Sequence, residues 1–198
     1  DISSNPPLFF SYAEIDPSIK SIIPTSGPTE GGTPVSIEFE KYMNYAHILC
    51  KFGDIFVNGT KDSASLKVFI CISPHVTDTT DAMSVQIGVS FNGIDFSQTP
   101  LFFTYYHLPK VIDIYPRSGP ELGGTMLSLG GSGFKDYAGL SCRFGITNST
   151  TVLGKWISDE QMICETPPLP PGSYVLGVSL NGIEFNLSAF LFISRKEI

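Results

Sequence analysis

Hydrophobic and polar residues alternate along several stretches of this chain. Over residues 85–91 an apolar side chain occurs at every second position, with a polar or small residue between, and residues 176–180 repeat the pattern. A period of two is typical of a β-strand with one buried face, and no stretch has the period of an α-helix. Glycine-rich turns separate further strands predicted at about 18–24 and 33–40, and at about 109–115 and 125–132. The pattern predicts an all-β protein.

The chain also repeats itself. Residues 23–33 return at 115–125 and residues 50–53 return at 142–145, both with an offset of 92, while residues 89–96 return at 178–185 with an offset of 89. An internal repeat of this length indicates two copies of one structural unit. About seven short strands in roughly ninety residues, with frequent turns, predict an immunoglobulin-like sandwich for each copy. We therefore expect two tandem domains, at 16–107 and 108–198.

The tail of the repeat occurs a third time at the start of the chain. Residues 8–11 match both 101–104 and 191–194, and the offset of 183 places Asp1 on Glu184. Residues 1–15 are thus predicted to be the last strand of a preceding or partner repeat. Its assembly strand is formed by Leu8, Phe9, Phe10 and Tyr12. Addition of such a strand to an exposed sheet edge would join two domains through backbone hydrogen bonds.

Two Asn-Gly pairs lie between apolar residues, at Asn92-Gly93 and Asn181-Gly182. This dipeptide is common where both central residues of a turn need a positive φ, as in the type I′ turn of a tight β-hairpin. The sequence therefore predicts a type I′ hairpin at each pair.

Each repeat carries two cysteines at equivalent positions. We predict one disulfide within each domain, Cys50–Cys71 and Cys142–Cys164, each closing a loop of about twenty residues. The alternatives are buried free thiols in a cytosolic protein and a zinc site. Zinc is disfavoured because a structural site needs four closely spaced ligands.

Three N-glycosylation sequons begin at Asn58, Asn148 and Asn186. Asn58 and Asn148 follow the first cysteine of their repeats by similar distances, so both are predicted to carry N-linked glycans on the same loop. Disulfides and glycans form in the same compartment, and together they predict an extracellular chain, either secreted or at the cell surface.

Composition and charge exclude several partners. With 12 Lys and Arg residues and a formal net charge of −7, the chain lacks the basic patch that nucleic acids or anionic membranes require. No apolar stretch approaches the roughly 18 residues of a membrane-spanning helix, so no direct membrane insertion is expected.

Catalytic signatures are missing as well. Glu38 and Glu40 share one face of a predicted strand and could in principle form a carboxylate pair, but their neighbours in that strand predict that this face contacts water. No catalytic residue, metal site or cofactor is predicted. His47, His75 and His107 are scattered without a nucleophile beside them, and Asp78, Asp81 and Asp113 are interpreted as solvated loop charges in preference to a calcium site. Core or domain-junction packing is favoured over a binding surface for Tyr105, Tyr106 and Trp156.

The order of these motifs resembles the IPT/TIG domain, an immunoglobulin-like fold shared by plexins and some transcription factors. The shared elements are Pro-x-Ser-Gly-Pro-x-x-Gly-Gly-Thr, Cys-Lys/Arg-Phe-Gly, Ile-Cys-x-Ser/Thr-Pro and Val-Ser-x-Asn-Gly-Ile-Asp/Glu-Phe. The cysteine pair is similar to the extracellular branch of the family. The resemblance implies spacer and adhesion modules of large surface proteins, without catalytic residues. Repeat one departs from the pattern at residues 39–42, where repeat two has Gly131-Ser132-Gly133-Phe134.

Two functions are compatible with these features. The first is a structural segment of a secreted or surface glycoprotein, with tandem domains forming a stalk or fibril whose partners are copies of itself or further repeats of the same chain. The alternative is an adhesion or signalling receptor ectodomain, which predicts an apolar patch free of glycans. A third possibility, an accessory domain of a carbohydrate-active enzyme, would need a catalytic domain outside this sequence.

Overall fold

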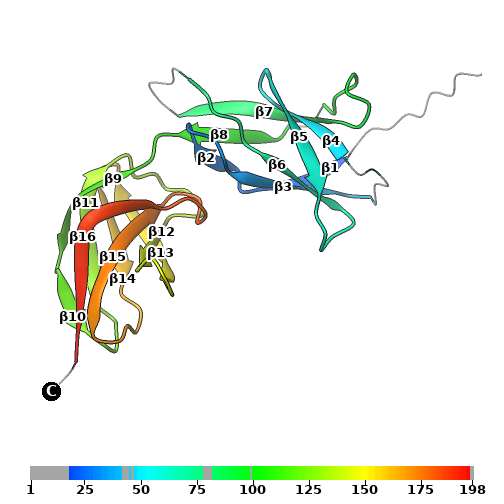
Figure 1. The fold of residues 1–198 in the computed structure, drawn as a ribbon. Coiled ribbons are helices and arrows are strands. Elements are labelled where there is room, and N and C mark those ends of the chain that lie inside the picture. The colour runs from blue at the N-terminus through cyan, green and yellow to red at the C-terminus, as the bar shows by residue number, and fades with distance from the viewer. Residues whose placement is uncertain (1–17, 42–44, 46, 78–81, 99, 197–198) are drawn as a thin grey trace, which may run out of the picture.

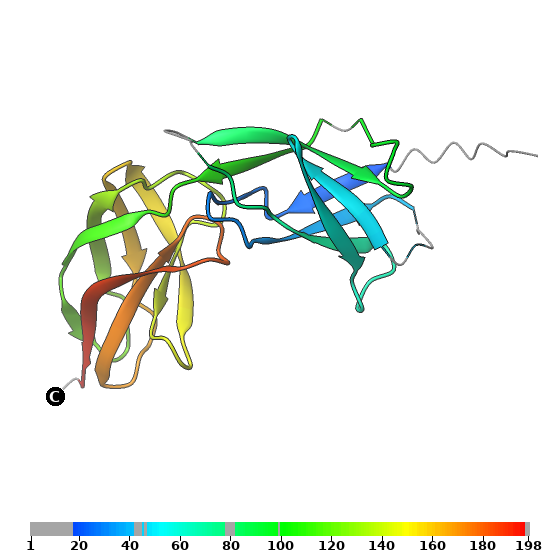
Figure 2. The ribbon, with the colours of Figure 1, turned by 45° about the horizontal axis from the view of Figure 1, so that its top comes forward.

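A computed structural model describes residues 18–41, 45, 47–77, 82–98 and 100–196. Within these residues the chain forms two β-domains arranged end to end at an angle, and the C-terminal strand runs along the second domain to its far end (Figure 1 and Figure 2). None of the described residues belongs to a helix that could cross a lipid bilayer. The predicted assembly strand, with Leu8, Phe9, Phe10 and Tyr12, lies outside the described residues.

Domain 1 has eight strands among its described residues, one more than predicted, because part of the first glycine-rich turn is itself a short strand. The strands are β1 (Ile19–Ile23), β2 (Ser26–Pro28), β3 (Pro34–Phe39), β4 (His47–Phe52), β5 (Ile55–Lys61), β6 (Val68–Ile72), β7 (Met83–Ser90) and β8 (Phe102–Tyr106). Neighbouring strands follow the order β1-β3-β6-β5-β4-β7-β8-β2. β2 runs parallel to β8, and the other pairs are antiparallel.

Domain 2 has the same strand order. Its strands are β9 (Lys110–Tyr115), β10 (Ser118–Pro120), β11 (Met126–Ser132), β12 (Ser141–Phe144), β13 (Thr150–Ser158), β14 (Gln161–Glu165), β15 (Gly172–Ser179) and β16 (Asn186–Arg195). The sequence β9-β11-β14-β13-β12-β15-β16-β10 is that of domain 1, strand for strand. Two copies of one all-β sandwich follow from the sequence repeat.

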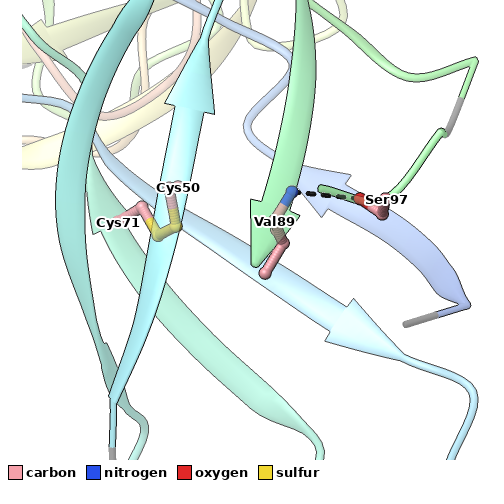
Figure 3. Close-up of a disulfide and its surroundings, with 4 residues drawn as sticks. All are labelled: Cys50, Cys71, Val89 and Ser97. Atoms are coloured by element: carbon pink, nitrogen blue, oxygen red, sulfur yellow. Dashed lines mark hydrogen bonds between the residues drawn. A yellow bond between two sulfur atoms is a disulfide. The ribbon is translucent and has the colours of Figure 1, made fainter. Parts of the chain in front are cut away.

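One strand in each domain joins the two layers of the sandwich. β13 pairs with β12 over residues 150–153 and then with β14 over residues 154–158. β5 likewise pairs with both β4 and β6, and the Cys50–Cys71 disulfide connects those two strands across Gly59 (Figure 3). The two layers of each domain turn alternate apolar side chains toward the core that they share, as the period of two predicts.

The predicted type I′ turns are wrong. Gly93 and Gly182 have positive φ, but neither Asn92 nor Asn181 does. Each asparagine instead accepts hydrogen bonds with its side-chain oxygen from the backbone N–H groups of the two residues after the glycine. This Asx turn holds the loop with a positive φ at the glycine alone. In domain 1 a longer loop follows β7, held by a hydrogen bond from the Val89 amide to the Ser97 hydroxyl at 3.0 Å (Figure 3).

The register of the last strand also differs from the prediction. Thr104 lies opposite Ser26, and Ile193 lies opposite the equivalent Ser118. The last strands of the two domains are therefore related by an offset of 89, not the 90 that the match of 101–104 with 191–194 requires. Sequence similarity could not detect this slip because apolar side chains occupy adjacent positions there.

Candidate functional site: the junction between the domains

The last residue of β8 connects the two domains. Tyr106 is only 2% exposed, and it packs in the core cluster of domain 2 although its strand belongs to domain 1. Its ring centroid lies 5.8 Å from that of Tyr137, in the loop that follows β11. An aromatic side chain buried in the neighbouring domain resists separation of the two, because its apolar surface would return to water.

A second contact comes from the loop between β15 and β16. The side-chain amide of Asn181 donates a hydrogen bond to the backbone carbonyl of Ser26 in domain 1 at 2.9 Å. The same amide also donates to Glu184. The side-chain carbonyl oxygen of Asn181 accepts hydrogen bonds from the backbone amides of Ile183 and Glu184, at 3.0 and 3.2 Å. The loop is therefore already ordered when it meets domain 1.

The linker between the domains is held on both sides. The Thr29 amide donates to the Tyr106 carbonyl at 2.9 Å, and the Thr29 hydroxyl lies 3.4 Å from Nδ1 of His107. On the other side, the side-chain amide of Asn186 donates to the Pro109 carbonyl at 2.8 Å. These bonds restrict the linker, which in many multidomain proteins is free to bend.

A cavity of about 520 Å³ opens at the junction. Domain 1 contributes apolar side chains, and domain 2 contributes the loops around Tyr137 and Asn181. Its lining includes Ile22, Ile23, Phe102, Tyr137, Ala138 and Asn181. No cluster of three or more residues able to hold a metal ion occurs in the part of the chain that the structure describes.

The buried phenols at the junction are held neutral. Burial raises the pKa of Tyr106 above its ordinary value, and the nearby carboxylate of Glu184 adds to the shift. Burial also raises the pKa of Tyr105, which packs in the core of domain 1. Neither phenol oxygen has a hydrogen-bond partner among the described residues. A neutral ring in apolar surroundings is suited to packing and unsuited to proton transfer.

Comparison with known proteins identifies the family. The model of the IPT/TIG domain matches residues 17–105 and again residues 109–192. The chain belongs to the IPT/TIG domain family. Human Plexin-B1 is 28% identical in an alignment of 164 residues, and the match covers 78% of this chain and 7% of that protein. A structure of the full extracellular region of Plexin A4, domains 1 to 10, superposes with a TM-score of 0.59 at 17% identity, covering 89% of this chain and 16% of that one.

The two IPT/TIG domains are thus similar to a small part of each plexin. The likeness to Plexin A4 shows the fold, and the family match points to no enzymatic family. Two disulfides and the match to Plexin-B1 indicate an extracellular location.

The cysteines pair within each IPT domain as expected from the sequence. Cys50 bonds to Cys71 in domain 1, and Cys142 bonds to Cys164 in domain 2. The described residues contain no free cysteine. In the loop-entropy view, each crosslink restricts the unfolded chain and stabilises its domain by about 3 kcal/mol.

The three sequons differ in their surroundings. Asn58 lies within strand β5 and Asn148 in the loop before β13, so the prediction that both lie on the same loop is wrong, although both are exposed to solvent. Asn186 at the start of β16 is half-buried, and its amide nitrogen bonds to the linker at Pro109. Sequence alone could not separate these cases because all three tripeptides have the same form.

The aromatic residues and carboxylates considered earlier have structural roles. Trp156 is half-buried against the core of domain 2 and donates to the Phe134 carbonyl at 3.1 Å. Glu38 lies on the solvent side of β3 and pairs with Lys20 at 2.9 Å, which lowers the pKa of its carboxyl group. The predicted core and solvent faces of this strand are confirmed. Tyr106 packs at the junction of the two domains, as the domain-junction interpretation of the Tyr105-Tyr106 pair predicted. The sequence did not point to Asn181 as a junction residue, because only the fold brings its side chain to Ser26.

Proposed function

We propose that this chain is part of a receptor ectodomain, in which the joined IPT domains present a protein-binding surface on domain 2. The Plexin-B1 match supports this alternative better than a stalk or fibril, and the two disulfides fit either extracellular role. The chain spans 7% of Plexin-B1, so the activity of that whole protein is not transferred.

The observation that carries the proposal is the outer face of the sheet β9-β11-β14-β13. Its side chains point away from the core, and several of them are large, apolar and exposed. They are Tyr115, Met126, Leu153 and Ile157, with the half-buried Ile163 between them. In the strand register Ser128 lies between Tyr115 and Ile163, and Lys155 lies on the other side of Ile163, so the apolar side chains of this face are interspersed with polar ones. Exposed apolar side chains rimmed by polar residues are typical of interaction sites.

The matching face of domain 1 is different. Gly59 lies opposite Cys71, and Gly154 lies opposite Cys164, so the residues before these glycines, Asn58 and Leu153, are equivalent. Domain 1 thus carries a sequon where domain 2 carries a leucine that is 78% exposed. A glycan at Asn58 would cover the first face, whereas no sequon of this chain lies at the equivalent place in domain 2.

A cavity beside Leu153 could accommodate a side chain of a binding partner. A cavity of about 460 Å³ is lined by Leu153, Leu122, Pro167 and the half-buried Val152. Aromatic or aliphatic side chains of a partner fit such sites, and a few buried anchors supply most of the binding energy in protein interfaces. The occupant that this chemistry fits is a protein with an exposed apolar side chain.

The test transplants the glycan of domain 1 to domain 2. Replacing Leu153→Asn together with Lys155→Thr creates the tripeptide Asn-Gly-Thr, which is identical to residues 58–60. Since domain 1 has this tripeptide at the equivalent strand position, we expect the variant to fold and be secreted. The tagged 198-residue chain is then measured for binding to an array of purified extracellular domains.

We expect partners that bind the unmodified chain to lose binding to the transplanted-glycan variant by at least about tenfold, the equivalent of 1.4 kcal/mol. The control variant Asn58→Gln removes the sequon of domain 1 and should leave those same interactions unchanged. Binding that survives the glycan on domain 2, or an array without any binder, would contradict the proposed surface.

A further inference from the structure

Domain 1 presents an aromatic ring beside one of its sequons. Phe56 lies on β5, two residues before Asn58, and its side chain is 52% exposed. Alternate residues of a strand point to the same face of the sheet. Gly59 faces inward, since a Cβ there would collide with Sγ of Cys71. The side chains of Phe56, Asn58 and Thr60 therefore form one row on the outer face.

Two neighbours hold the Phe56 ring in place. Its centroid lies 5.4 Å from that of Phe96, in the loop after β7, and 5.7 Å from Nζ of Lys51. Lys51 is directly opposite Phe56 in the pairing of β4 with β5. A ring that its neighbours already fix loses little freedom when a further group packs on it. About half of the Phe56 side chain stays open to such a group.

The sandwich fold does not require a ring at this position. Since Asn58 and Leu153 are equivalent, the residue of domain 2 that corresponds to Phe56 is Thr151. Thr151 is exposed on β13, and Leu153 is not part of a sequon. The ring and the sequon thus occur together in domain 1, and both are replaced at the same two positions of domain 2.

The two other sequons have different surroundings. Ile146 stands two residues before Asn148, but both lie in the loop before β13, and Asn148 has a positive φ of 51°. At Asn186 the residue two positions earlier is the charged Glu184. Of the three sequons, which all lie in the described part of the chain, only that of Asn58 shares a strand face with an exposed aromatic ring two residues earlier.

The first sugar of an N-linked glycan suits such a ring. Glycosylation joins the side-chain nitrogen of asparagine to the anomeric carbon of N-acetylglucosamine. The nitrogen loses a proton, and the lipid diphosphate that carried the sugar leaves with the electrons of the broken C–O bond. The sugar ring has a face of C–H groups that the neighbouring oxygens polarise. Such groups are attracted to the electron-rich face of an aromatic ring.

We propose that Phe56 is a docking site for the N-acetylglucosamine attached to Asn58. Residues on the same face of a strand are about 6–7 Å apart, so a sugar that begins at the Asn58 nitrogen reaches the exposed part of the neighbouring ring. The sugar then covers apolar surface that water otherwise contacts, and it becomes part of the outer face of domain 1. The contact needs glycosylation of Asn58 and does not depend on the binding surface proposed for domain 2.

Nuclear magnetic resonance tests the contact in the chain without any substitution. The 198-residue protein is produced in cells that attach high-mannose glycans, and an endoglycosidase trims each glycan to one N-acetylglucosamine. Protons above the face of an aromatic ring are shifted upfield. We expect the C–H protons of the sugar on Asn58 to lie upfield of their positions in the urea-unfolded chain, with cross-peaks to the Phe56 ring. Unshifted sugar protons without these cross-peaks would overturn the proposal, and so would an Asn58 that carries no glycan.

Hydrogen exchange measures whether the contact stabilises the domain. The exchange rates of the buried amides of β4 and β6 are compared between the trimmed glycoprotein and Asn58→Gln. We expect the sugar to slow this exchange by about fivefold, which is the size of an ordinary aromatic contact. In Phe56→Thr, which installs the residue type that domain 2 has at this place, the sugar should slow exchange by less than about twofold.

A matched control separates the ring from any exposed apolar side chain. Leu66, in the turn between β5 and β6, is 64% exposed. In Leu66→Thr the sugar on Asn58 should keep its full effect on exchange. A sugar effect that is equally large in Phe56→Thr and in the original chain would show that the sugar acts without the ring, which also contradicts the proposal.

Discussion

The two domains build the same sandwich with different core residues. In domain 1, β3 ends at Phe39, whose ring is fully buried and lies 5.6 Å from both Phe69 and Phe91. In domain 2, the equivalent Gly131 has no side chain, because a Cβ there would collide with the Lys110 carbonyl and crowd Phe134. The ring of Phe134, three residues later, is fully buried in the core.

This difference shows that the fold depends on filling a volume and not on which residue fills it. β11 continues to Ser132 with a bulge against β9, and the chain then returns Phe134 to the core. In domain 1 the irregular pairing lies instead between Ile19 and Ser21 on β1. Cores of this kind tolerate rearrangement when the total volume is kept.

The largest effect is expected from removing either ring. Phe39→Ala and Phe134→Ala should each lower the free energy of unfolding of their own domain by about 3–5 kcal/mol, through lost burial and the cavity left behind. Trp156 is the only tryptophan and lies in domain 2, so its fluorescence in a urea titration reports that domain, while circular dichroism reports both. Ile94→Ala, at an exposed site, is the control. A loss below about 1 kcal/mol for either ring would contradict the equivalence of Phe39 and Phe134.

A smaller effect is expected at the junction, where the Tyr106 side chain from β8 of domain 1 packs in the core of domain 2. The Tyr106 hydroxyl is buried without a partner among the described residues, so Tyr106→Phe should raise stability by about 1 kcal/mol. The folded pKa of Tyr106 lies above its ordinary value of 10.0, so its contribution is complete below that pH and is lost as pH rises beyond it.

The variant should therefore lose less stability than the original chain between about pH 9 and 11, as measured by urea titration at each pH. Tyr105, which is also buried with a raised pKa, remains in both proteins and accounts for the loss that persists. Parallel curves for the two proteins would show that ionisation of Tyr106 is not coupled to folding.

The smallest effect concerns the sequons, which distinguish the exposed faces of the domains. We expect high glycan occupancy at Asn58 and Asn148 and low occupancy at Asn186 when the chain is secreted from animal cells. The Asn186 side chain is half-buried, and its amide nitrogen bonds to the Pro109 carbonyl. Peptide mapping by mass spectrometry measures all three sites in one sample. Similar occupancy at Asn186 and Asn58 would contradict the expected effect of burial.

Much of the architecture could be predicted from the sequence because it depends on local pattern and on repetition. Alternation in residues 85–91 predicts a strand with one buried face, and the structure confirms β7 there, with Ile87 and Val89 fully buried. The recurrence of the cysteines at equivalent positions indicated the pairing that the structure has. These signals are carried by residues close together in sequence or by direct comparison of the two repeats.

The sequence alone did not determine the contacts between residues that are far apart in the chain. Nothing local to Asn181 identifies the Ser26 carbonyl as its partner, 155 residues away, and nothing local to Leu153 shows that it occupies the place of Asn58. The 89-residue offset of the last strands was settled only by the pairing of β10 with β16. The sequence determined two copies of an IPT fold, whereas the tertiary structure decided how they join and which faces remain exposed, because both depend on distances between residues remote in the chain.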